Sequence, residues 1–122
     1  MAARLSVPDI FFHNFLPGCS FILGNVDFHD ERTFEAKKED RNIVYSIGIH
    51  PKFARDLFSL DLAGFALCVK SGGFVAVGET GICSKWVSEK KNPAPLPLQL
   101  KLFHFHILLS KASGLPLILH LR

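Results

Sequence analysis

Four short apolar runs, each bounded by Gly, Pro or Asn, constrain the fold of this chain most strongly. They span residues 19–28, 42–50, 73–79 and 115–120. Aliphatic and β-branched residues without polar alternation are typical of strands that are buried on both faces. Because longer connectors separate the runs, we expect parallel strands joined by right-handed crossovers. At this point the pattern fits a barrel as well as an open, doubly wound α/β sheet.

The three connectors between these runs are predicted to be helical. Residues 29–41 are mostly charged, with Asp30 placed as an N-cap, and indicate a short, solvated helix. Residues 53–70 carry an apolar helical stripe that glycines close. Residues 95–114 fit alternation as well as helical spacing, and their length favours a helix ending at Gly114. The two expected stripes are Phe58, Leu62, Phe65 and Val69, and then Leu102, Phe105, Leu109 and Ala112.

Composition narrows the class of protein. The chain has 122 residues, 48% of them hydrophobic and twelve of them Phe, which argues against disorder and against two domains. No run reaches the roughly 18 to 20 apolar residues of a membrane span, and Pro8 and Asp9 interrupt the place of a signal-peptide core. Three widely spaced cysteines suggest reduced thiols.

We therefore expect an intracellular protein, nuclear or cytoplasmic, without membrane association. The net charge of +3 is compatible with a phosphate-bearing partner.

Three polar residues stand at the carboxyl ends of successive apolar runs: His50, Glu79 and His120. In parallel α/β folds these strand ends converge on one face, where active sites are built. Taken singly, each has an ordinary structural interpretation, as a turn residue, a helix cap and a core imidazole respectively. Taken together, imidazole and carboxylate groups at one edge suit a divalent metal that activates water.

Residues 46–54, 73–83 and 99–122 carry a family resemblance. They resemble, in this order, a G-x-H-P turn, a G-E-x-G-L-D turn and a Q-x-x-x-F helix leading to P-x-x-x-H-x-R, which are signatures of the TatD family of metal-dependent deoxyribonucleases. The segment PGCSFILGNVDFHDERT is similar to the region before these motifs in the animal branch with a long N-terminal extension. The resemblance marks residues 17–122 as a partial hydrolase domain and residues 1–16 as a divergent N-terminal segment.

The resemblance implies an α/β fold, a partial TIM barrel comprising about strands 2 to 5 with the intervening helices. It implies that His50, Glu79 and Arg122 are catalytic, that Glu79 bridges metal ions and that His120 binds one of them. His50 and Arg122 would contact the substrate phosphate. The complete family site implies two divalent ions, Mg, Mn or Zn, and a DNA substrate whose phosphodiester bonds are cleaved.

The chain departs from the family pattern at several metal-binding positions. No His-x-His precedes Cys19, where His13 stands by itself, and Cys83 replaces the Asp of the second signature. A thiol in place of that carboxylate weakens support for the metal, and as a ligand it would favour zinc. The family's later His and Asp ligands would lie beyond Arg122. We therefore expect at most one weakly held ion and an incomplete, weakly active or inactive form. The alternative is a non-catalytic half-barrel interaction module that self-associates or pairs with the missing barrel half.

The remaining charged and imidazole side chains are assigned to the surface. Lys52, Arg55 and Lys85 stand near the expected site and could steer a nucleic-acid backbone, but solvated surface positions are the simpler interpretation. His104 and His106 lie two positions apart on the predicted third helix, so they do not face each other. We expect them to flank its packed face or to snorkel.

Overall fold

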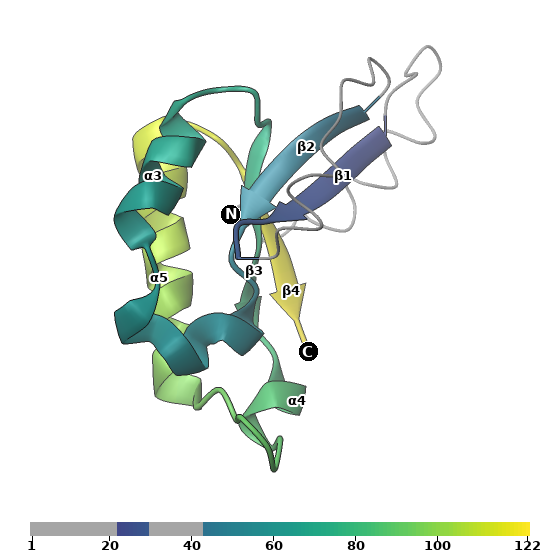
Figure 1. The fold of residues 1–122 in the computed structure, drawn as a ribbon. Helices are drawn as coiled ribbons and strands as arrows, with labels where there is room; N and C mark the ends of the chain where they lie inside the picture. The colour runs from purple at the N-terminus through teal and green to yellow at the C-terminus, as the bar shows by residue number, and fades with distance from the viewer. Residues whose placement is uncertain (1–21, 30–42) are drawn as a thin grey trace.

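The computed structural model describes residues 22–29 and 43–122, and these form one parallel sheet covered by helices. The strands are β1 (Ile22–Asp27), β2 (Ile43–Gly48), β3 (Ala76–Ile82) and β4 (Leu117–Leu121). The helices are η2 (Pro51–Ser59), α3 (Leu62–Lys70), α4 (Ser84–Val87) and α5 (Leu96–Ser113). Figure 1 shows η2, α3 and α5 on one side of the sheet, with α4 directly beyond the carboxyl end of β3.

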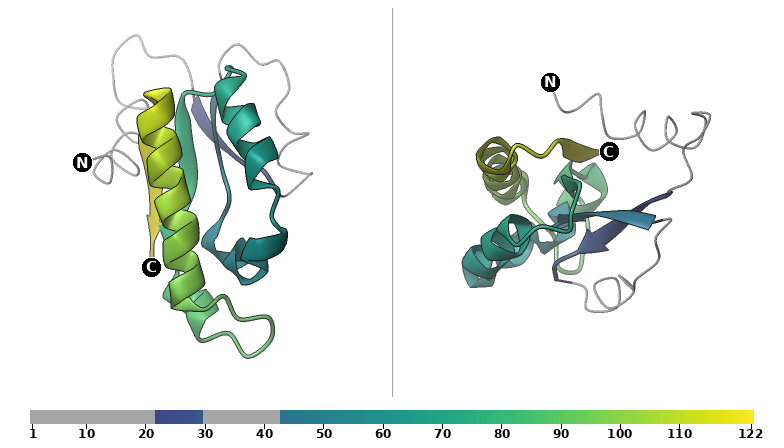
Figure 2. Two further views of the ribbon diagram at one scale, coloured as in Figure 1. Left: turned by 90° about the vertical axis from the view of Figure 1, so that its left-hand side faces the viewer. Right: turned by 90° about the horizontal axis from the view of Figure 1, so that it is seen from above.

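The strand order distinguishes between the two sheet architectures that the sequence left open. The order is β1-β2-β3-β4, and every neighbouring pair is parallel. A doubly wound sheet reverses its strand order and carries helices on both faces, whereas η2, α3 and α5 share one face, with α3 and α5 side by side (Figure 2). This arrangement confirms the α/β class and the partial TIM barrel.

Two of the predicted segments lie wholly or partly outside the described residues. The helix expected over residues 29–41, with Asp30 as its cap, falls there except for its first residue. The first strand is described from residue 22, so residues 19–21 of that prediction are also untested.

The third strand lies three residues further along the chain than predicted. Gly72 and Gly73 adopt positive φ angles of 85° and 87°, so the turn after α3 extends to the position where the strand was expected to begin. At the carboxyl end of β3 the strand continues through Gly81 to Ile82. A Cβ on Gly81 would collide with the carbonyl oxygen of His120 on β4, so glycine permits the close approach of the two strands. Glu79 therefore lies within β3.

The single helix predicted over residues 53–70 is wrong, because the chain forms two helices there. Leu60 is extended (φ −71°, ψ 140°), and the side chain of Asp61 accepts the Gly64 amide at 2.9 Å, which starts α3 afresh. The break shifts the helical phase before it, so Phe58 is 86% exposed and Leu57 packs in the core instead. In the second half of the stripe Phe65 and Val69 are buried as predicted, and Leu62 packs against them.

Helix α5 ends at Gly114 as predicted, in a left-handed conformation with φ 74°. Its packed stripe differs from the expected one, because Ala112 is exposed and Phe105 is only partly buried. The expectation that His106 flanks the packed face is also wrong, since this residue is fully buried. The buried stripe consists of Gln99, Leu102, His106 and Leu109.

The hydrophobic core lies between the sheet and the helices. Its fully buried members include Val26, Ile47, Ile49, Phe65, Val77 and Leu102. Each of the first three strands thus contributes at least one side chain to the same cluster as α3 and α5. Among the described segments, no helix is long and apolar enough to cross a membrane.

Candidate metal and phosphate site

The carboxyl ends of the parallel strands bring the predicted residues to one edge of the sheet. Strands β2 and β3 approach closely there, because Gly48 and Gly78 lie back to back: a Cβ on Gly48 would come within 2.7 Å of the Gly78 Cα atom. This contact gives a structural reason for glycine before the Ile49–His50 pair. It also places the chain after β2 beside the segment that carries Glu79.

Glu79 occupies an irregularity in the ladder between β3 and β4. Gly78 pairs with Ile118 and Thr80 pairs with Leu119, so Glu79 is the extra residue of a β-bulge. Bulges re-aim side chains and are common beside active sites. Glu79 is therefore not the strand-end residue that the apolar run predicts; the bulge sets its position.

The carboxylate of Glu79 and the imidazole of His120 come together. The distance between His120 Nδ1 and Glu79 Oε1 is 3.5 Å, with the side chains 25% and 37% exposed, respectively. The other ring nitrogen of His120, Nε2, is buried and has no hydrogen-bond partner among the described residues. A buried polar atom without a partner costs about 1–3 kcal/mol, so this nitrogen is suited to a ligand.

His50 lies beside this pair and is held in a defined tautomer. Its Nδ1 accepts the backbone amide of Lys52 at 3.0 Å, so His50 caps η2 and its proton resides on Nε2. Its ring packs edge-on against the His120 ring, with 4.8 Å between centroids. Burial, together with the nearby positive charges of His120, Lys52 and Lys85, lowers the pKa of His50 to about 4. The ring is therefore neutral at physiological pH and offers one N–H donor.

Asp27, at the end of β1, is a site residue that the sequence analysis missed. Its two carboxylate oxygens accept the backbone amides of His29 and His50, each at 2.9 Å. Burial raises its pKa above the ordinary value, and the two hydrogen bonds oppose this change. Its position at a strand end, like those of His50 and His120, was a signal that could have identified it.

Gln99 and the backbone of Cys83 form hydrogen bonds that were not predicted from the sequence. The buried Gln99 carboxamide accepts the Cys83 amide at 2.8 Å and donates to the carbonyl oxygens of Cys83 and Ala94 at 3.1 and 2.7 Å. The glutamine of the third signature therefore fixes the backbone directly after β3. Cys83 is buried, and its side chain does not cap α4.

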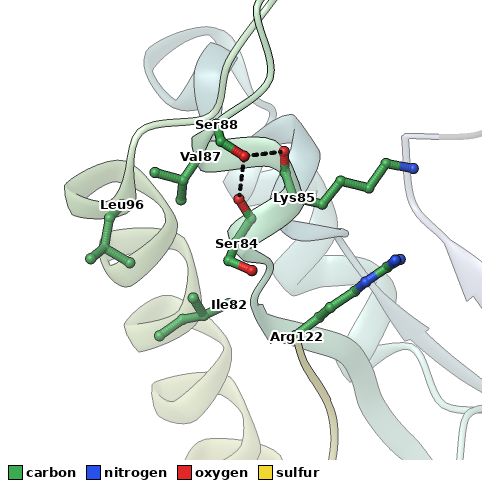
Figure 3. Close-up of a pocket in the computed structure, with 7 residues that line it drawn as sticks. All are labelled: Ile82, Ser84, Lys85, Val87, Ser88, Leu96 and Arg122. Atoms are coloured by element: carbon green, nitrogen blue, oxygen red, sulfur yellow. Dashed lines mark hydrogen bonds between the residues drawn. The ribbon is translucent and has the colours of Figure 1, made fainter.

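Arg122 lies beside a pocket at the ends of β3 and β4 together with Lys85. The pocket has a volume of about 640 Å³ and an apolar wall that includes Ile82 and Leu96. Figure 3 shows that the side chains of Lys85 and Arg122 extend to the same side, away from that wall. The backbone of Arg122 continues the pairing with β3, donating to the Ile82 carbonyl at 3.0 Å. Two cations are therefore presented next to the site edge.

The other basic residues near the edge have local partners. Lys52 Nζ lies over the rings of Phe53 and Trp86, at 5.1 and 6.0 Å from their centroids. Arg55 forms an ion pair with Asp56 at 3.3 Å. These contacts are consistent with surface roles.

The residues present fit two ligands of a divalent cation. Carboxylate oxygen and imidazole nitrogen are suitable donors, and Glu79 Oε1 faces His120 Nδ1 at 3.5 Å. Within residues 22–29 and 43–122 no third His, Cys, Asp or Glu joins them in a ligand group. The described site is therefore a pair of ligands, with His50 beside it and Arg122 at the neighbouring pocket.

Two comparisons with known proteins identify the family of this chain. Residues 15–122 match the family described as TatD related DNase. An uncharacterized metal-dependent hydrolase TatD from Mycobacterium tuberculosis is 34% identical over 87 residues, which cover 71% of this chain. The matched region covers 33% of that relative's length, so the chain matches about a third of it. The match over almost the whole chain and the parallel barrel-type sheet lead to one conclusion: this chain belongs to the TatD-related DNase family.

Proposed function

We propose that this chain carries part of the active site of a metal-dependent hydrolase that cleaves phosphodiester bonds in DNA. The observation that carries the proposal is the Glu79–His120 pair, whose Nδ1–Oε1 distance is 3.5 Å and whose imidazole retains a buried, unpartnered nitrogen. Membership in the family of TatD-related DNases supports this reaction, and the mycobacterial relative, a metal-dependent hydrolase, supports the use of a metal ion.

In this proposal Glu79 and His120 hold the divalent cation, which can be Mg, Mn or Zn. When bound, such a cation activates water and neutralises charge on a phosphate oxygen. His50, which is neutral, donates its Nε2 proton in a hydrogen bond to the phosphate. Arg122 binds the phosphate with its planar guanidinium group, and Lys85 adds positive charge on the same side of the pocket.

Two protein ligands hold a divalent ion weakly, so we propose at most one weakly bound ion for this chain and slow or no turnover by it alone. A fluorogenic DNA substrate assayed with Mg²⁺, Mn²⁺ and an EDTA control tests this. Any turnover should disappear with EDTA and in Glu79→Gln, and persist in Glu89→Gln, which alters a carboxylate outside the site. Turnover that Glu79→Gln leaves unchanged would refute the site assignment. Fast turnover that this variant abolishes would refute the weak-site proposal.

A second candidate function is a non-catalytic half-barrel that binds another copy of the chain or a missing barrel half. Large apolar side chains that stay exposed favour it, among them Leu100 at 46%, Leu108 at 50% and Leu121 at 64%. Such surface is commonly covered by other protein. Sedimentation equilibrium distinguishes the two candidates, because a stable dimer supports the module and a monomer with chelator-sensitive activity supports the hydrolase.

A further inference from the structure

The buried imidazole of His106 joins α5 to the end of β2 through both ring nitrogens. Its Nε2 accepts the backbone amide of Ile49 at 2.9 Å, and its Nδ1 lies 2.8 Å from the carbonyl oxygen of Leu102. Because Nε2 is an acceptor, the proton resides on Nδ1 and is donated to Leu102. Burial lowers the pKa of His106 to about 4, which keeps the ring in this neutral form.

The next backbone amide along the chain is held in the same way by another side chain. The His50 amide donates to Asp27 Oδ2 at 2.9 Å, and Asp27 Oδ1 accepts the His29 amide. Two successive amides where β2 ends are thus fixed from opposite sides, one from α5 and one from β1. Both amides lie beyond the described ladders of β2, which end at Gly48 on the side of β1 and at Ile47 on the side of β3.

We propose that His106 and Asp27 are positioning residues that set the place of the His50 imidazole beside His120. The proposal rests on the proposed function only in giving His50 a phosphate to contact. We call the hydrogen bonds from His106 and Asp27 to these two amides the clamp, and it acts through the backbone. With both amides fixed and the Lys52 amide donating to His50 Nδ1, the His50 ring has one orientation, 4.8 Å from the His120 ring. Small displacements of a catalytic group reduce rates strongly, so a rigid turn is a functional requirement at this place.

A purely structural role for His106 makes a different prediction. A core histidine that only fills space supports the whole sheet, and its loss loosens all strands together. A positioning residue affects the amides of Ile49 and His50 selectively. Gln is the conservative replacement, because its side-chain oxygen can take the place of Nε2 and accept the Ile49 amide. Leu fills similar space and accepts nothing.

The test compares His106→Leu and His106→Gln in the full chain, with His104→Leu as the matched control on the exposed face of α5. Amide hydrogen exchange followed by NMR is the readout. We expect His106→Leu to accelerate exchange at Ile49 and His50 at least tenfold, with the amides of Val77 and Ile118 unchanged. His106→Gln should return the rates to within about threefold of wild type, and the His50 ring resonances should shift only in the Leu variant. Asp27→Asn should accelerate exchange at His50 more than at Ile49.

Three results would overturn the proposal: unchanged exchange at Ile49 and His50 in His106→Leu, a uniform increase over all strands, or no rescue by Gln. The readout needs neither metal nor turnover, so it is separate from the proposed function. If the variants show the selective exchange pattern but the wild-type chain takes up no Mn²⁺, the metal-site proposal fails and the positioning role stands. If the wild-type chain hydrolyses DNA, His106→Leu should lower kcat at least tenfold with KM within about twofold, and equal losses in His104→Leu would count against the clamp.

Discussion

The imidazole of His120 and the carboxylate of Glu79 face each other between neighbouring strands, with 3.5 Å between Nδ1 and Oε1. The contact depends on the bulge in β3, which inserts Glu79 as an extra residue opposite β4. A regular ladder would leave no such extra residue. The local irregularity of the sheet is therefore what assembles the candidate site.

The buried His106 predicts a dependence of stability on pH. Its pKa in the folded chain is about 4, below the ordinary 6.5. Between pH 6.5 and pH 4 the imidazole is therefore protonated in the unfolded chain and neutral in the folded chain. The stabilisation is complete above pH 6.5 and is lost as pH falls towards 4, by about 3 kcal/mol in total. Urea unfolding at pH 7, 6, 5 and 4 measures it. His106→Gln should flatten the profile, while His50 adds a dependence of the same sign that remains. An equally steep profile in the variant would contradict the assignment.

Gln99 should be one of the costliest polar side chains to remove. Gln99→Leu leaves the amide and carbonyl of Cys83 and the carbonyl of Ala94 without their partner in a buried place. We expect a loss of about 2–4 kcal/mol in the free energy of unfolding, measured by urea denaturation. Lys101→Leu on the exposed side of the same helix is the control and should stay within about 0.5 kcal/mol of wild type. Similar losses in both variants would argue against the role of these hydrogen bonds.

How much of this could be predicted from the sequence differs between the fold and the site. Continuous apolar runs identified the four strands, since burial on both faces produces that pattern. The helix boundary at Asp61 was missed because its capping bond competes with a continuous apolar stripe. The bulge at Glu79 was also missed, since it depends on strand pairing with residues about forty positions away.

His106 shows why part of the site could not be predicted. Spacing alone does not tell whether a histidine on a helix is buried or exposed. Its burial depends on whether a backbone amide of another element lies where the imidazole can accept it. Ile49 is 57 positions away in the sequence. Asp27, in contrast, stood at a strand end and could have been identified by the same reasoning that selected His50.

Arg122 and Lys85 should contribute to the binding of DNA through its phosphates. Both side chains extend to the same side of the pocket (Figure 3). We expect Arg122→Ala to weaken binding of a short DNA duplex about tenfold and to reduce the slope of log K against log salt by roughly one. Fluorescence anisotropy at several salt concentrations measures both. Lys101→Ala, which removes a cation elsewhere, should change neither quantity by as much. Equal effects of the two variants would indicate binding by net charge alone.

The exposed leucines of α5 predict self-association at high concentration. Leu100 and Leu108 lie on the same helix, and each exposes about half of its surface. Replacing both with Gln should lower the tendency to associate without loss of stability, because neither side chain is buried. Sedimentation velocity over a range of concentrations measures this. Association that stays the same in the double variant would show that another surface is responsible.

Binding of Mn²⁺ is the most direct test of the central claim, that Glu79 and His120 are ligands of a divalent cation. Electron paramagnetic resonance of free Mn²⁺, titrated against the purified chain, gives the affinity. We predict weak uptake by the wild type, with the dissociation constant at least tenfold higher in Glu79→Gln and in His120→Gln. The controls Glu89→Gln and His104→Gln should bind as the wild type does. The claim is contradicted if the wild type takes up no Mn²⁺, or if both site variants take it up as well as the wild type.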